Sequence, residues 1–69
     1  MSLSKDVEVK LKAFMRFAKA LADHIGDEDY RGDFESAISN AIADYVAYII
    51  DKEATITIDL EHETITIKR

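Results

Sequence analysis

The residues best suited to chemistry in this sequence are two histidines with neighbouring carboxylates. His24 follows Asp23, and His62 stands between Glu61 and Glu63. Imidazole and carboxylate groups bind metals and transfer protons. Neither histidine has a second histidine at ligand spacing, and the dipole of a helix is by itself enough to favour a histidine at its carboxyl end. We therefore expect two exposed histidines and no metal site.

The acidic segment over 27–32 partly matches a calcium-binding loop. It reads Asp-Glu-Asp-Tyr-Arg-Gly, which places acids at loop positions 1 and 3 and glycine at position 6. Calcium also needs an oxygen ligand at position 5 and a bidentate glutamate at position 12, where this chain has Arg31 and Ile38. The segment is therefore predicted to be an ordinary acidic loop.

Motifs for catalysis are missing from the sequence. Without cysteine there is no thiol nucleophile, thiolate metal site or disulfide. Two glycines are too few for a glycine-rich phosphate loop, and no serine lies in a Gly-x-Ser-x-Gly turn. We predict no enzyme activity, no catalytic residues and no cofactor. A site formed only between two copies stays open, with His24 or Tyr45 as the residues to test.

A helix over 4–25 is the first element expected to position these residues. Its apolar residues recur every three or four positions, the spacing of one helical face, and Ser4 and Gly26 are suited to begin and end it. A second stripe, which contains Val9 and Phe17, makes the apolar arc wider than one core face needs. The main stripe is expected to consist of Val7, Leu11, Phe14, Ala18, Leu21 and Ile25.

A loop over 26–33 and a second helix over 34–51 are predicted next. The loop has two glycines and four acids without periodicity, and apolar residues at helical spacing follow it. Asp33 is expected to cap this helix. Tyr48 belongs to residues that widen its apolar arc.

Strands over 54–60 and 63–68 complete the chain, because the apolar period there changes to two. The segment over 60–63 lacks glycine, which favours a four-residue loop over a tight two-residue turn. The expected register places Ile58 opposite Ile65 and Ile56 opposite Ile67, with all four isoleucines on one face.

These elements predict one α+β domain over 1–69, a two-helix hairpin followed by a two-stranded antiparallel β-hairpin (ααββ). A chain of 69 residues buries a small core, and self-association is a common way to stabilise it. The wide apolar arcs and the two open hairpin edges predict a homodimer joined through a four-stranded sheet. A monomer whose helices alone shield the hairpin is the alternative. The residues predicted to self-associate are Val9, Phe17, Tyr48, Ile56, Ile58, Ile65 and Ile67.

The net charge is −5, and it is unevenly distributed. Residues 1–19 hold five basic and two acidic groups, whereas residues 20–69 hold four basic and twelve acidic groups. An acidic chain argues against nucleic-acid binding. No apolar run approaches the about 20 residues that span a bilayer, and the charged start argues against a signal peptide. We therefore expect no membrane partner and a cytoplasmic location.

The function expected from these observations is that of a small non-catalytic module that self-associates and has room for a further protein partner. The alternative is an acidic inhibitor or nucleic-acid mimic. Its carboxylates over 27–35 and 51–63 would bind a basic groove on another protein.

Overall fold

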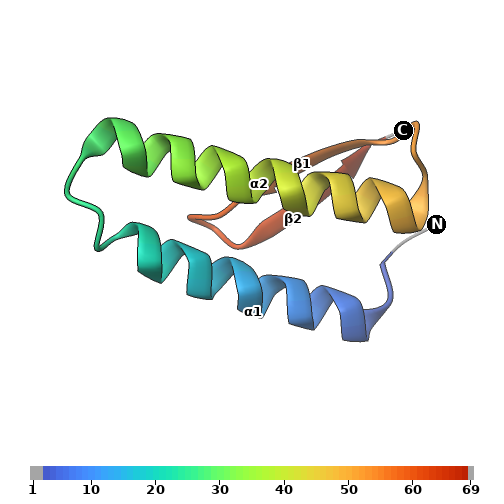
Figure 1. Cartoon of the computed structure of the whole chain (residues 1–69). Helices are drawn as coiled ribbons and strands as arrows, with labels where there is room; N and C mark the ends of the chain where they lie inside the picture. The colour runs from blue at the N-terminus through green and yellow to red at the C-terminus, as the bar shows by residue number, and fades with distance from the viewer. Residues whose placement is uncertain (1–2, 69) are drawn as a thin grey trace.

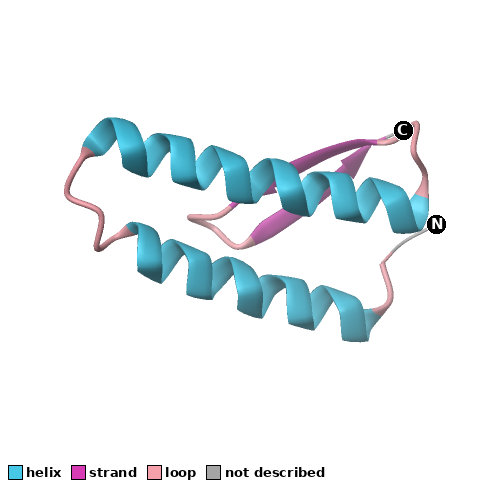
Figure 2. Cartoon of the chain, viewed as in Figure 1, coloured by secondary structure: helices cyan, strands magenta, loops and turns pink. Residues whose placement is uncertain are grey.

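The computed structural model describes residues 3–68 and shows two helices followed by an antiparallel β-hairpin (Figure 1; Figure 2). This confirms the α+β arrangement in the order ααββ. Residues 1, 2 and 69 of the predicted domain over 1–69 lie outside the described residues. The elements are α1 (Lys5–Ala22), α2 (Glu28–Ile50), β1 (Thr55–Asp59) and β2 (Thr64–Lys68).

The two helices lie side by side in one layer, and the hairpin lies behind them as a second layer (Figure 1). Helix α2 is the central element, because it packs on both α1 and β1. The Cα atoms extend over 39 × 22 × 16 Å. The molecule is therefore a thin slab with helices on one side and strands on the other.

Helix α1 begins where the sequence predicts and ends earlier. The Ser4 hydroxyl accepts a hydrogen bond from the Val7 N–H at 3.2 Å, which confirms Ser4 as the cap. The helix ends at Ala22, so the predicted end at residue 25 is wrong. Gly26 lies in the following loop without a positive φ, and its left-handed freedom is not used to end the helix.

Helix α2 begins six residues earlier than predicted, so the loop predicted over 26–33 is wrong for residues 28–33. Asp27 is the cap in place of Asp33, since its Oδ1 accepts from the N–H groups of Asp29 at 2.9 Å and Tyr30 at 3.1 Å. Arg31 donates from Nη1 to the Ile25 carbonyl at 3.1 Å and so holds the loop against the helix start. The segment that resembled a calcium loop is therefore the first turns of a helix.

The β-hairpin has the predicted register. Ile58 pairs with Ile65 and Ile56 pairs with Ile67. Residues 60–63 form the connecting loop, so the predicted strands over 54–60 and 63–68 were too long by one residue at the loop and β1 also starts one residue later. The loop needs one left-handed residue, Glu63, with φ 52°.

The core forms where α1, α2 and the end of β1 meet. Its buried cluster consists of Met15, Ile42, Val46, Ile50 and Leu60. The four hairpin isoleucines are half-buried against this cluster, while the threonines of both strands are exposed. The isoleucine face of the hairpin is thus turned towards the helices of its own chain.

Candidate functional site

The side of the helices that faces away from the hairpin carries exposed apolar residues. We name this surface the outer helix face, and it consists of Phe14, Phe17, Leu21, Tyr45, Tyr48 and Ile49, whose side chains are between 39% and 73% exposed. Residues on each helix are spaced by three or four positions or directly adjacent, so they form one stripe per helix.

Helical geometry fixes the direction of these two stripes. The hairpin side of α1 is marked by Arg16, which binds the hairpin loop, and that of α2 by Ser36, which faces β1. A helix turns by about 100° per residue. Phe14 therefore lies about 160° from Arg16 around α1, and Tyr45 lies about 180° from Ser36 around α2. The α2 stripe and, in the α1 stripe, Phe14 and Leu21 therefore point away from the hairpin, whereas Phe17, about 100° from Arg16, lies at the border of this face.

The structure separates the residues predicted to self-associate into three groups. Phe17 and Tyr48, which are 62% and 73% exposed, lie on the outer helix face. Val9 is 56% exposed, about 140° around α1 from Phe14, and so lies on another flank. The remaining four, Ile56, Ile58, Ile65 and Ile67, pack against the core of their own chain.

Sequence periodicity misplaced part of the core of α1. Phe14 and Leu21 belong to the stripe predicted to be buried, yet both are about half exposed. Ala18 of that stripe is buried, and so are Met15 and Ala22, which the stripe did not include. Small alanine side chains allow neighbouring elements to approach closely, so they occupy the contact and leave larger neighbours outside. The available sequence signal for this contact was the spacing of four between Ala18 and Ala22, which stand beside larger apolar residues.

Ion pairs connect α1 to the hairpin loop and to α2. The Arg16 guanidinium donates from Nη2 to Glu63 Oε1 at 2.8 Å and from Nε at 3.2 Å, and these hydrogen bonds raise the pKa of Arg16. Lys19 Nζ contacts Asp23 at 3.1 Å and Glu35 at 3.3 Å, which raises the pKa of Lys19. These cations are therefore committed to contacts within the chain.

The two histidines do not form a joint site. His62 contacts Asp59 through Nδ1 at 2.8 Å inside the hairpin loop, and His24 is exposed in the loop after α1. Tyr45, the other residue named for a site between two copies, lies far from His24 in the chain fold. It is about 25 Å along α2 from the first residue of that helix, at a rise of about 1.5 Å per residue. Over residues 3–68, no group of three His, Cys, Asp or Glu side chains is placed to hold a metal ion.

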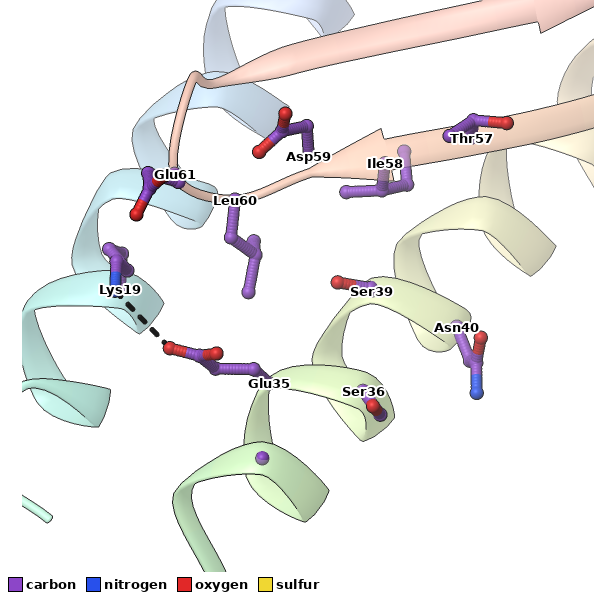
Figure 3. A pocket seen from close by; sticks show the side chains of 11 residues that line it. Lys19, Glu35, Ser36, Ser39, Asn40, Thr57, Ile58, Asp59, Leu60 and Glu61 are labelled. Carbon is purple, nitrogen blue, oxygen red and sulfur yellow. Dashed lines mark hydrogen bonds and ion pairs between the residues drawn. The ribbon is translucent and has the colours of Figure 1, made fainter. Parts of the chain in front are cut away.

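A groove of about 630 Å³ separates α2 from β1 and is here named the α2–β1 groove (Figure 3). The wall on α2 is made mostly of small or polar residues. Figure 3 shows Ser36, Ser39 and Asn40 on this helix, with Thr57 and Ile58 on the strand across the groove. The groove lining is Lys19, Gly32, Glu35, Ser36, Ser39, Asn40 and residues 57–61.

The polar residues of this wall were not predicted to face another element of the chain. Ser36 and Asn40 have no local sequence signal for facing another element, because that depends on how the hairpin folds back over α2.

Within the described part of the chain, neither helix is long and apolar enough to cross a membrane. Comparisons with protein-family models, curated proteins and solved structures found no match to this chain.

Proposed function

We propose that this protein is a non-catalytic module that works by self-association, and that two copies pack together through the outer helix face. The observation that carries this proposal is the exposure of six large apolar side chains on one side of a slab. Large apolar side chains gathered on an exposed face mark interaction sites on proteins. A second copy would cover it with an identical surface.

The accessible surface area supports the view that one face of the single chain is left uncovered. The chain has 4891 Å² of accessible surface for a mass of 7.8 kDa. A compact monomer of that mass exposes about 4,400 Å². The excess of about 500 Å² is of the same order as the about 800 Å² that each partner buries in a stable complex.

The chemistry of the face suits burial between two copies. Its six residues carry no charge, and two of them are tyrosines, whose hydroxyls can remain at a wet rim while the rings are buried. Lys10 is the cation beside the face, and it already pairs with Asp6 on the same helix at 2.9 Å. A two-fold arrangement would give a four-helix inner layer with the hairpins outside.

The four-stranded sheet predicted from the sequence stays a prediction, and packing widths favour the helix face over it. Two helices side by side lie about 8–10 Å apart, whereas two strands lie about 4.8 Å apart. The helix layer is thus wider than the hairpin beneath it. Pairing two hairpins edge to edge would bring the helices of both copies together on one face of the sheet. Because each helix layer is wider than its hairpin, the two layers would crowd each other there.

The proposal is tested by measuring the molecular mass of variants by light scattering. Phe17→Glu and Tyr48→Glu should each weaken the dimer by about tenfold or more, because charged groups replace buried aromatic anchors. Val9→Glu is the matched control, since Val9 is similarly exposed on another flank of α1 and should leave the dimer intact. A dimer that survives both face variants, with protected strand amides, would favour the four-stranded sheet.

Salt separates this proposal from the acidic-mimic alternative. An apolar interface persists or tightens as ionic strength rises, whereas carboxylates that bind a basic groove lose affinity. Sedimentation of the wild-type chain at low and high sodium chloride measures the first effect directly. A dimer that dissociates as salt is added would contradict an apolar interface.

A further inference from the structure

The α2–β1 groove follows the open edge of β1. Side chains of successive strand residues point to opposite faces, and Thr57, Ile58 and Asp59 all line the groove. No residue of β2 is among the lining residues in the described chain. The groove therefore runs along the edge of β1 that is remote from β2, where the described chain provides no neighbouring strand.

The opposite wall leaves room beside this edge. Residues 32, 35, 36, 39 and 40 follow the spacing of one helical stripe, and three of the five are glycine or serine. Gly32 has no side chain and Ser36 and Ser39 have short ones, so this wall of the groove carries little side-chain bulk. An exposed sheet edge is the feature to which proteins bind extended peptides by strand addition.

We propose that the α2–β1 groove binds an extended, lysine- or arginine-rich peptide as a third strand beside β1. Main-chain groups on an open strand edge are available to hydrogen-bond an added strand. The groove volume of about 630 Å³ lies within the range of ligand sites. This site is separate from the outer helix face and can be occupied in the monomer or in the proposed dimer.

The charge of the lining selects a basic peptide. Three carboxylates, Glu35, Asp59 and Glu61, line the groove against a single ammonium, Lys19. Lys19 is already bound by Glu35 and by Asp23 outside the groove. Asp59 contacts His62, whereas Glu61 has no ion-pair partner within residues 3–68. An anionic ligand would be repelled here, and a cationic one attracted.

A second copy of β1 fits this edge less well than a basic peptide. Antiparallel pairing of two β1 strands centred on Thr57 would place Glu61 opposite Glu53 of the second copy, and the reverse pair would repeat the repulsion. A peptide also brings no helix layer of its own. The alternating strand would direct small side chains towards Ser36 and lysines towards Asp59.

The test titrates the peptide acetyl-Lys-Val-Lys-Val-Lys-Val-amide into the wild-type protein labelled with ¹⁵N. Amide resonances of residues 57–61 and 32–40 should shift and approach saturation at about 1 mM peptide or below. The matched peptide with glutamate in place of lysine should produce no shifts. Added salt should weaken the interaction with the lysine peptide.

Two pairs of variants locate the site. Ser36→Arg fills the groove and adds positive charge, so it should abolish the shifts, whereas Asp33→Arg adds the same side chain outside the lining and should retain them. Glu61→Gln should weaken binding about two- to fivefold, the range for one exposed ion pair. Glu53→Gln makes the same change in net charge away from the groove and should have no such effect.

Some results of these experiments would contradict peptide binding in the groove. Equal binding of the glutamate peptide would overturn the charge argument. Shifts confined to the outer helix face, or none at all at about 1 mM peptide, would overturn the groove as the site. Circular dichroism of each variant verifies that lost binding does not come from lost folding.

Discussion

The hairpin loop is held by a pair of titratable side chains, His62 and Asp59. The Asp59 carboxylate accepts from the His62 backbone N–H at 3.1 Å and contacts its Nδ1 at 2.8 Å. The hydrogen bond with Asp59 raises the pKa of His62, and the same bond lowers the pKa of Asp59. A loop without glycine thus uses side chains to close.

This pair makes the stability of the protein depend on pH. The stabilising contribution of His62 is present below its ordinary pKa of 6.5 and is lost as pH rises through its higher folded-state pKa. The contribution of Asp59 is present above its ordinary pKa of 3.8 and is lost as pH falls through its lower folded-state pKa. A nuclear magnetic resonance titration of the His62 ring should therefore have its midpoint above 6.5.

Asp59→Asn is the matched control for this titration, because the amide oxygen can still accept the backbone hydrogen bond while the charge is removed. The His62 midpoint should move back towards 6.5 in this variant. A wild-type midpoint at or below 6.5, or one that ignores the substitution, would contradict the contact.

Met15 has one of the two largest fully buried side chains among the described residues. Its side chain is fully buried and belongs to the cluster that joins α1 to α2 and to Leu60. Met15→Ala should cost about 2–5 kcal/mol of unfolding free energy, close to the about 3–5 kcal/mol that a core of this size supplies. We expect that variant to be largely unfolded.

Met15→Leu conserves volume and should cost less than about 1.5 kcal/mol. Urea denaturation at one fixed protein concentration measures both variants, since association would otherwise add to stability. If Met15→Ala unfolds with the same midpoint as the wild type, then α1 does not pack on the core as described.

At the scale of the elements, the start of α2 shows why local sequence misled. Glycine and a run of acids are typical of loops, and Gly32 costs a helix about 1 kcal/mol relative to alanine. Tertiary and capping contacts outweigh this cost. Asp27 caps the first turn, Glu28 and Asp29 favour the positive end of the helix dipole, and Arg31 bonds the preceding loop.

Gly32→Ala tests this early start. An added Cβ at Gly32 meets no atom within 4 Å, and Gly32 has no positive φ. The substitution should therefore raise the free energy of unfolding by about 0.5–1 kcal/mol through helix propensity. Thermal unfolding followed by circular dichroism measures the change. A loss of stability would indicate that residues 28–33 are not helical.

The hairpin could be predicted from sequence because its information is local. Alternation fixed the isoleucine face, and a loop over 60–63 fixed the register of Ile58 with Ile65. The outer helix face could be predicted only in part. Phe17 and Tyr48 were identified as surplus, but Phe14 was assigned to the core because the preference for Met15 depends on how closely the helices approach.

The α2–β1 groove could not be predicted in the same way. It joins residues 32–40 to residues 57–61, and the contact depends on the path of the hairpin behind α2. No pattern within either segment encodes that path. Polar residues on a helix and an alternating strand each look complete when they are considered separately.

The whole molecule is a two-layer slab with different chemistry on its two sides. One side presents the uncharged outer helix face, and the other carries the hairpin, with the acidic α2–β1 groove beside its edge. Because the two surfaces do not overlap, a dimer formed through the helices leaves both copies of the groove open. The proposed dimer and the proposed peptide binding are therefore compatible within one assembly.

Sedimentation equilibrium of the wild-type chain at micromolar concentration tests self-association most directly. We expect a mass about twice the 7.8 kDa of one chain, which falls to the monomer value in Phe17→Glu and is retained in Val9→Glu. A wild-type mass of 7.8 kDa that does not change on raising the protein concentration would contradict it.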